Sequence, residues 1–526
     1  MQKIRISKPA ILVILDGWGV DQANRGNAIT LSKTPNLNFL LKNYPNTLLG
    51  ASGRFVGLPN GQDGNSEAGH MNLGAGRIAE QDAVRISRNI ANGTFFKNPA
   101  FLEAVNHAKE NHGNVHLMGM LGNNMTAHSD PDHLIALIAF LKKEGVQRIN
   151  LHLFTDGRDS PKYAAIKLMR QLEKSFTGVE TINTVIGRFY AMDRKKVWER
   201  TEMSYNVLVE GGCDADECRW SLNPEEAITE AYNRGESDEY ILPYIIGRPG
   251  KPYPRIADGD SVIFYNLRSD RARQLAKAFV QPNFNELNPG SFKRRVVFKN
   301  LCFVAMTDFG PDLDSILSAF PSPDLTDTLP MQLKERSQLY IAETEKYAHV
   351  TYFFNGGYSD PVAGESRILV PSPDVRSYDE TPEMSSKGLV KEVISNLKKK
   401  KFDFTTLNFA APDMIGHTGN LEAAIKCCEA VDGYVGNLVE AYHKIGGTVI
   451  ITADHGNIER MINLQTGEID TEHTTNPVPF ILVNQEMRNK VKLRTDGVLG
   501  DVAPTILDLF GLPLPKAMPR KSLLLR

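Results

Sequence analysis

Short apolar runs rich in β-branched residues alternate along the chain with longer stretches in which apolar residues recur every three or four positions. The short runs predict strands, and the longer stretches predict amphipathic helices. This alternation is typical of an α/β fold with a mostly parallel sheet. The clearest predicted strands are Ile11–Leu15, Val115–Leu121, Ile149–Phe154, Val262–Leu267, Phe404–Phe409 and Val449–Ala453.

Helical periodicity is strongest over Leu421–Ile445, and Gly446-Gly447 follows it as the expected C-terminal cap. The chain has 526 residues, whereas single hydrophobic cores stop growing at roughly 250–300 residues. Two domains are therefore predicted. The Pro-rich run over Thr307–Pro323 breaks regular structure, and it is interpreted either as the linker between domains or as a surface loop.

The composition is that of an ordinary globular protein, with 60 Lys+Arg against 62 Asp+Glu. No basic stripe is present, so no nucleic-acid partner is expected. The N-terminus lacks the apolar segment of a signal peptide, and we expect a cytoplasmic protein without a membrane partner. The five cysteines show no zinc-type spacing and are predicted to be reduced packing thiols.

Acidic residues and histidines follow several predicted strands. Because parallel strands end at one edge of a sheet, these side chains are expected to gather there. Such carboxylates repel one another unless cations compensate them. Asp and His ligands without thiolates suit Mn²⁺, Zn²⁺ or Fe²⁺ better than Ca²⁺, and paired metals are common in phosphoryl transfer. The residues are Asp16, Asp413, His417, Asp454, His455 and, in the following loop, His473.

A Gly-rich segment, Gly61–His70, contains the step Asn65-Ser66, which is typical of a helix N-terminus. A hydroxyl held beside a metal there would be an activated nucleophile towards phosphorus. In the alternative interpretation, Ser66 is only an N-cap and the glycines only form turns. Local sequence leaves both interpretations open.

Several arginines in the middle of the chain are candidates for binding an anionic substrate, because guanidinium groups recognise phosphate and carboxylate bidentately. Arg268 follows a predicted strand and Arg271 comes three residues later, so a helical turn would direct both at one anion. Surface ion pairs are the alternative for each of them. The full set is Arg158, Arg188, Arg194, Arg268 and Arg271.

Taken together, these segments resemble the cofactor-independent phosphoglycerate mutases, and the resemblance runs nearly from end to end. The segments that carry it are Asp16-Gly17-Trp18-Gly19, Gly64-Asn65-Ser66-Glu67, Gly187–Arg194, Ala342–Tyr347, Ala411–His417, Asp454–Asn457 and His473–Pro479.

The resemblance implies an alkaline-phosphatase-like domain formed by residues 1–79 and 319–526, with a phosphotransferase domain, residues 80–318, inserted into it. It implies two divalent ions, with Mn²⁺ favoured, and no requirement for 2,3-bisphosphoglycerate. One ion would be bound by Asp413, His417 and His473. The other would be bound by Asp16, Ser66, Asp454 and His455. A monomer acting on a small-molecule substrate is expected.

In the implied reaction, Ser66 accepts the phosphoryl group of 3-phosphoglycerate and returns it to the 2-hydroxyl. Asp159 would be the acid/base. The implied glycerate contacts are His128, Arg158, Asp159, Arg188 and Arg194. The implied phosphate contacts are Arg268, Arg271 and Lys346, which would also neutralise developing charge, and Lys346 is counted with Ser66 and Asp159 as catalytic. The alternatives are a related metal-dependent phosphatase or phosphopentomutase, and a metal-stabilised scaffold without activity.

One loop departs from the pattern of the family. A stretch similar to Ser-Asp-Gly-Gly-Val is expected before His128, but the chain has the longer Gly122–Ala127 there and Asp130 where a second histidine is usual. This departure concerns substrate handling and leaves the implied metal ligands unchanged.

Overall fold

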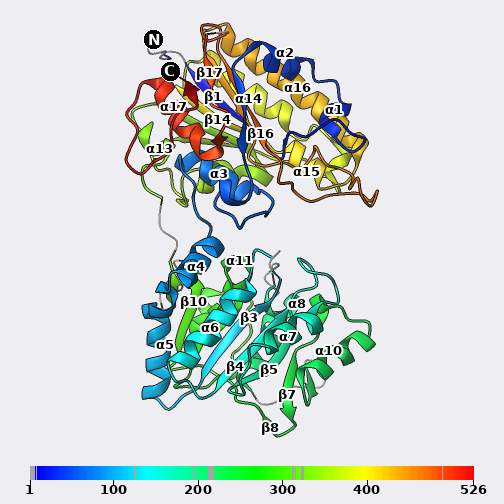
Figure 1. The fold of residues 1–526 in the computed structure, drawn as a ribbon, viewed down its shortest axis with the longest axis vertical. Helices are drawn as coiled ribbons and strands as arrows, with labels where there is room; N and C mark the ends of the chain where they lie inside the picture. The colour runs from blue at the N-terminus through cyan, green and yellow to red at the C-terminus, as the bar shows by residue number, and fades with distance from the viewer. Residues whose placement is uncertain are drawn as a thin grey trace. The chain divides into compact units, whose positions relative to one another are not determined.

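The computed structural model describes residues 6, 9–123, 126–193, 195, 197–210, 218–310, 313, 315–321, 325–488 and 490–525. The chain forms two compact units, drawn in Figure 1. Unit 1 comprises Met1–Gln81 and Pro323–Arg526, and unit 2 comprises Asp82–Ser322. The α/β fold class with parallel strands is confirmed in both units.

Unit 1 is built on an eight-stranded sheet, counted over the described residues, in the order β13-β12-β14-β1-β15-β16-β2-β18. The five strands from β13 to β15 are parallel, and β16 is antiparallel to both its neighbours. The strands are β1 Ala10–Leu15, β2 Asn46–Gly50, β12 Gln338–Glu343, β13 Ser366–Val370, β14 Phe404–Phe409, β15 Thr448–Thr452, β16 Val478–Val483 and β18 Gly497–Val498. A separate pair is formed by β17 Lys492–Leu493 and β19 Leu524–Leu525.

The central strand β1 consists entirely of apolar residues, and all six are fully buried. Such a run is typical of a parallel strand covered on both faces. Helices supply the cover, and the longest is α16, which ends at His443. Gly446 then adopts a left-handed φ of 68°, as expected for the predicted cap. The helices are α1 Ala28–Leu31, α2 Pro35–Asn43, α3 Ser66–Ala75, α13 Leu329–Gln332, α14 Ser386–Lys398, α15 Ala411–Gly416, α16 Leu421–His443 and α17 Val502–Phe510.

Unit 2 has a nine-stranded sheet, again counted over the described residues, in the order β11-β10-β9-β3-β4-β5-β7-β6, with β8 paired to β7. The strands are β3 Val115–Leu121, β4 Ile149–Thr155, β5 Glu180–Gly187, β6 Arg219–Ser221, β7 Tyr244–Arg248, β8 Lys251–Pro252, β9 Ser261–Phe264, β10 Cys302–Thr307 and β11 Leu317–Phe320. The helices are α4 Asp82–Ala91, α5 Pro99–Glu110, α6 Pro131–Lys143, α7 Ala165–Glu173, α8 Arg188–Ala191, α9 Trp198–Val209, α10 Pro224–Asn233, α11 Ser269–Val280 and α12 Phe284–Leu287.

Two hydrophobic cores lie on the two faces of the unit 2 sheet. Alternate residues of β3 separate between them: Leu117 and Leu121 pack with α5 and α6, while Met118 and Met120 pack with α9 and α11. This separation follows from the two-residue period of a strand. Unit 2 is therefore a sheet covered by helices on both faces.

The two units divide between Ser322 and Pro323, at the C-terminal end of the predicted linker Thr307–Pro323, but the run is not free of regular structure as predicted. Leu317–Phe320 is strand β11, which pairs in parallel with β10. The Phe320 ring stacks on Phe95 at 5.9 Å between centroids, and this packing holds the segment in the core of unit 2. The predicted boundary before residue 319 therefore divides a strand.

The cysteines and the helices bear on two further expectations from the sequence. Cys427 and Cys428 are buried free thiols and Cys302 is a half-buried one, but Cys218 is disulfide-bonded, so the prediction of reduced thiols is wrong for Cys218. Among the helices of the described residues, none combines the length and the apolar character needed to cross a membrane.

Candidate active site

Three buried aspartates lie at one edge of the unit 1 sheet. Asp16 directly follows β1, Asp454 follows β15, and Asp413 lies in α15, which follows β14. Because β14, β1 and β15 are adjacent and parallel, their carboxyl ends meet at the same edge. Each of the three residues is at most 2% exposed. Compensating positive charge is required at this edge, since buried carboxylates are costly without it.

Ser66 is the first residue of α3, and its hydroxyl lies within the same cluster. Its Oγ is 3.1 Å from Asp16 Oδ1 and 3.0 Å from His455 Nε2. The N-cap is the preceding residue, Asn65, whose side chain accepts from the Ala68 N–H at 2.9 Å. Gly69 allows the close approach, because a Cβ there would lie 2.6 Å from the Asp454 carbonyl oxygen. Ser66 is therefore not the N-cap, and its hydroxyl is available for chemistry.

His417 and His473 converge on Asp413. The Nδ1 atoms of the two histidines lie 2.8 Å from the carbonyl oxygens of Thr471 and Gly64, respectively. These contacts place the protons on Nδ1, so the lone pairs of Nε2 are directed away from the backbone. The two Nε2 atoms are 3.1 Å apart and lie 3.4 and 3.3 Å from Asp413 Oδ1. This donor set fits a divalent transition-metal ion.

A second donor set comprises Asp16, Asp454 and His455, beside Ser66. His455 Nε2 lies 3.5 Å from Asp16 Oδ1 and 3.6 Å from Asp454 Oδ2. Asp454 Oδ2 is buried without a hydrogen-bond partner among the described residues. A buried carboxylate oxygen that accepts no hydrogen bond and lies beside an imidazole nitrogen fits a second cation. The structure thus brings together all seven predicted metal ligands in unit 1.

Lys346 occupies the centre of this cluster. Its Nζ lies 2.8 Å from Ser66 Oγ, 2.7 Å from Asp413 Oδ2 and 2.7 Å from Asp16 Oδ1. Burial alone would lower the pKa of Lys346, but Asp16 and Asp413 raise it above its ordinary value. Burial would likewise raise the pKa of Asp16, yet Lys346 holds it well below the usual range. The ammonium therefore stays charged and donates to the Ser66 hydroxyl.

His455 is also influenced by the aspartates. Burial acts to lower the pKa of His455, but the charge of Asp454 and contacts with Asp16 raise it to about 10 in the metal-free protein. A protonated His455 and Lys346 together compensate the three carboxylates when no metal is bound. Metal binding at Nε2 would displace that proton.

A second polar group is found in unit 2. Arg188 is 1% exposed and bonds through Nη1 to Asp159 Oδ2 at 2.9 Å and to Asp156 Oδ1. Thr126 Oγ1 donates to the same Asp159 oxygen at 3.0 Å. Burial acts to raise the pKa of Asp159, but Arg188 and Thr126 lower it below its ordinary value. Asp159 is therefore a carboxylate at neutral pH.

The backbone of His128 is hydrogen-bonded to the segment that leads from β9 to Arg268. Its carbonyl oxygen accepts from Leu267 N–H at 2.8 Å. Burial, and secondarily Arg188, lowers the pKa of His128 to about 4, so its imidazole is neutral. Arg268 is the N-cap residue of α11 and Arg271 lies in its first turn. Their Nε atoms lie 3.5 and 3.8 Å from the two carboxylate oxygens of Asp270.

The remaining predicted substrate residues are placed as follows. Arg158 is exposed at the end of β4, where its backbone N–H donates to Asp156 Oδ1 at 3.3 Å. Arg194 lies outside the described residues. Lys346, predicted to bind phosphate with Arg268 and Arg271, belongs to unit 1, whereas the arginines belong to unit 2.

Several buried polar residues that support the site were missed by sequence reasoning. Glu459 is fully buried and accepts from Gly19 N–H at 3.1 Å and Asn457 N–H at 2.8 Å, which ties together the loops after β1 and β15. Asn457 in turn donates to Asp413 Oδ1 at 2.8 Å. Both residues follow the Asp454-His455 pair within four positions, and polar residues so close to a predicted ligand pair are the sequence signal that would have found them.

Glu343, at the end of β12, provides a test of stability against pH. Burial raises its pKa from 4.5 to about 7. The folded state therefore binds this proton more tightly than the unfolded state, and stability falls as pH rises from about 4.5 to about 7. Glu343→Gln is expected to raise the free energy of unfolding by roughly 2–3 kcal/mol at pH 8, and the gain should shrink towards pH 5. Urea denaturation at both pH values measures it, with the exposed Glu335→Gln as the control. An equal effect at both values would contradict the assignment.

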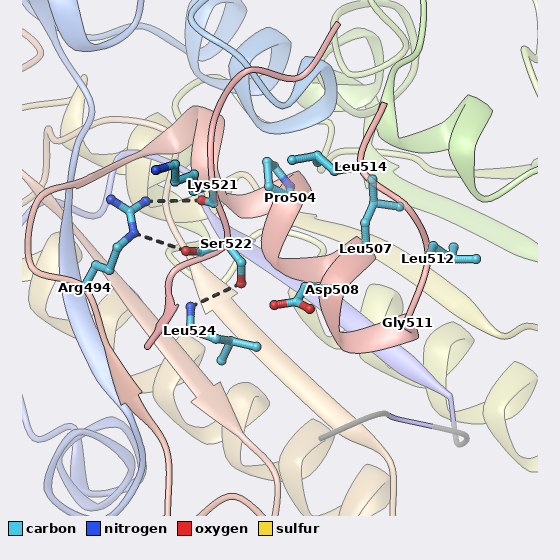
Figure 2. Close-up of a pocket in the computed structure, with 10 residues that line it drawn as sticks. All are labelled: Arg494, Pro504, Leu507, Asp508, Gly511, Leu512, Leu514, Lys521, Ser522 and Leu524. Atoms are coloured by element: carbon cyan, nitrogen blue, oxygen red, sulfur yellow. Dashed lines mark hydrogen bonds between the residues drawn. The ribbon is translucent and has the colours of Figure 1, made fainter. Parts of the chain in front are cut away.

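A cavity of about 460 Å³ lies elsewhere in unit 1, beside α17 (Figure 2). None of the candidate site residues is among those that line it. Arg494, one of the cationic residues that line the cavity, donates to the carbonyl oxygens of Ser522 and Lys521 at 3.1 and 3.2 Å (Figure 2) and pairs with Asp501. This cavity therefore has no part in the candidate chemistry.

A family model and several known proteins match the chain over nearly its whole length. A family model described as the Metalloenzyme superfamily matches residues 8–514. The 2,3-bisphosphoglycerate-independent phosphoglycerate mutase of Clostridioides difficile is 47% identical over 99% of both chains. Phosphoglycerate mutase 1 of the same type from Methanosarcina acetivorans is also 47% identical over 99% of both. A crystal structure of Leishmania mexicana phosphoglycerate mutase at low cobalt concentration matches with a TM-score of 0.77 and 30% identity, covering 99% of this chain and 98% of that one. The chain therefore belongs to the family of 2,3-bisphosphoglycerate-independent phosphoglycerate mutases.

Proposed function

We propose that this chain interconverts 3-phosphoglycerate and 2-phosphoglycerate through a phosphoserine on Ser66, with two divalent metal ions and without 2,3-bisphosphoglycerate. The observation that carries the proposal is the position of the Ser66 hydroxyl, which contacts Asp16, His455 and Lys346 at 2.8–3.1 Å. A serine so placed among converging metal donors is the arrangement expected of a phosphoryl acceptor. The family to which the chain belongs supports the same reaction.

Ser66 Oγ would attack phosphorus, and the bond from phosphorus to the 3-oxygen of the substrate would break. Bound divalent ions would lower the pKa of the Ser66 hydroxyl and neutralise charge on the phosphoryl oxygens. Lys346 donates to Ser66 Oγ and would stabilise the negative charge that develops on that oxygen. The ligands assigned to the ions are Asp413, His417 and His473 for one, and Asp16, Ser66, Asp454 and His455 for the other.

Glycerate is proposed to bind unit 2 through His128, Arg158, Arg188 and Arg194, with phosphate contacts from Arg268, Arg271 and, in unit 1, Lys346. In the first step the proton lost by Ser66 would pass to the departing 3-oxygen. In the second step Asp159 would take the proton of the 2-hydroxyl as that oxygen attacks phosphoserine, and this proton would end on the departing Ser66 Oγ, which restores the free serine. Its lowered pKa keeps Asp159 ionised, and therefore able to accept a proton, at neutral pH. Arg188 fixes the orientation of this carboxylate.

Mn²⁺ is the metal we propose, because the donors are carboxylate oxygens and imidazole nitrogens without a thiolate. We also propose a cytoplasmic monomer that works without nucleic acid or a membrane. The formal net charge of −2 supports the absence of a nucleic-acid-binding role. Sedimentation of the purified protein tests the monomer.

The decisive experiment is the conversion of 3-phosphoglycerate to 2-phosphoglycerate by metal-stripped protein, without 2,3-bisphosphoglycerate, before and after addition of Mn²⁺. Turnover that requires Mn²⁺ is expected. Release of inorganic phosphate without isomerisation would instead identify a phosphatase. Turnover that is unchanged in the metal-stripped protein would contradict the assigned role of the ions.

A further inference from the structure

His70 is a buried histidine next to the metal donors that the proposed mechanism does not use. It lies in α3, one turn after Ser66, and is fully buried. Its Nδ1 is 2.9 Å from the Ser66 carbonyl oxygen and 3.2 Å from Asp454 Oδ2. Together with Asp16 and Asp454 it forms a third group spaced for a metal ion. Spacing alone is therefore compatible with two roles for His70: a metal ligand, or a residue that positions the ligands.

Asn408 determines which nitrogen of His70 carries the proton. This residue lies on β14, is fully buried, and has its amide nitrogen 2.7 Å from Asp16 Oδ2 and 3.0 Å from His70 Nε2. The amide must present N–H to Asp16, because the reversed orientation would place its oxygen against a carboxylate. Its second N–H then points to His70 Nε2, which must accept. The proton of His70 is consequently on Nδ1 and is donated to the Ser66 carbonyl oxygen.

This arrangement uses both nitrogens of His70 and leaves no lone pair for a metal. His417, His455 and His473 also have Nδ1 facing a backbone carbonyl oxygen, but they differ from His70 at Nε2, which faces carboxylate oxygens in all three. The contacts of His70 form a continuous chain from Asp16 through Asn408 to the first turn of α3. That chain links the strand end of β1 to the backbone of Ser66.

We propose that His70 and Asn408 are positioning residues that hold Asp16 and Ser66 in the geometry for metal binding, and that His70 is not itself a ligand. The inference rests on the proposed metal site, but not on the identity of the phosphorylated substrate. Preorganisation of this kind is the role of the outer hydrogen bonds around metal ligands. Without the chain, Asp16 and the first turn of α3 would have to be ordered by the metal itself.

The test measures Mn²⁺ affinity by calorimetry on the metal-stripped full chain. Asn408→Leu and His70→Leu are each expected to weaken binding about 10–100-fold, and the double variant should be no weaker than the worse single variant, because either change breaks the same chain. His349→Leu is the matched control: its ring lies 5.4 Å from that of His70, but among the described residues it makes no hydrogen bond or ion pair with a proposed ligand, so affinity should stay within about twofold. His70→Asn, which keeps a donor near the position of Nδ1 but cannot reach Asn408, should lose about tenfold and serves if His70→Leu does not fold.

Pulsed electron paramagnetic resonance measures the couplings of bound Mn²⁺ to ligand nitrogens. These couplings distinguish a His70 that only positions the ligands from a His70 that binds the metal itself. The couplings of the three ligand histidines should persist in the His70 variants. Loss of a histidine coupling would overturn the inference, as would affinities within twofold of the wild type in folded Asn408→Leu and His70→Asn. Mutase activity is not needed for either result, so weakened Mn²⁺ binding in a protein that fails the mutase assay would refute the proposed reaction and leave this inference standing.

Discussion

Ser66→Ala is expected to reduce interconversion of the phosphoglycerates by at least about 10³-fold, because no other group can replace a covalent nucleophile. The Ser66 hydroxyl, which contacts Asp16, His455 and Lys346, is the proposed acceptor oxygen. The measurement is the rate of 2-phosphoglycerate formation with saturating Mn²⁺. Mass spectrometry after rapid quenching should detect a phosphorylated peptide containing Ser66 in the wild type and not in the variant.

Ser52→Ala is the matched control for this experiment. Ser52 is also a buried serine of unit 1, and its hydroxyl donates to the Thr475 carbonyl oxygen at 3.0 Å, outside the metal donors. Its loss should leave turnover within about threefold and cost stability of about 1 kcal/mol. Turnover by Ser66→Ala within tenfold of the wild type would exclude a phosphoserine on this residue.

Lys346→Met is expected to have a different effect with and without metal. In the metal-free protein the ammonium contacts Asp16 and Asp413, and both carboxylates are buried. Removing one partner of a buried ion pair leaves uncompensated charge, so the free energy of unfolding in chelator should fall by roughly 3–5 kcal/mol. Saturating Mn²⁺ should restore most of that loss, because the cations compensate the same carboxylates. Turnover should remain low, since Ser66 Oγ loses its donor.

Urea denaturation in chelator and in Mn²⁺ measures both parts of this prediction. The control is Lys444→Met, which removes a surface pair with Glu440 whose side chains are 70% and 66% exposed. Such a pair contributes about 0.5 kcal/mol or less, independent of Mn²⁺. A loss of stability in Lys346→Met that is the same in chelator and in Mn²⁺ would contradict a shared role of the ammonium and the metals.

The strand-end residues could be found from the sequence because their position follows from local rules. A buried apolar run such as Ile11–Leu15 predicts a parallel strand, and parallel strands bring the residues that follow them to one edge. Asp16, Asp454 and His455 therefore share that edge. The Asn65-Ser66 step likewise predicts a helix start, because an Asn side chain caps the first turn.

Other features depend on contacts between distant parts of the chain, and no local pattern could predict them. Leu317–Phe320 follows a Pro-containing segment, yet it becomes strand β11 because Phe320 packs against Phe95. Asn408 lies inside a strand, where side-chain alternation gives no sign that its amide would meet Asp16 and His70.

The sequence by itself determined the α/β class, the strands that flank the candidate site, the nucleophile candidate and the chemical type of the metal donors. These depend on residue type and on spacing over a few positions. Only the tertiary structure decided the order of the strands, the place of Lys346 between Asp16 and Asp413, and the proton position on His70. The physical reason is that hydrogen bonds and charge compensation in a buried cluster join residues that lie tens to hundreds of positions apart, and their directions are set by packing rather than by sequence neighbours.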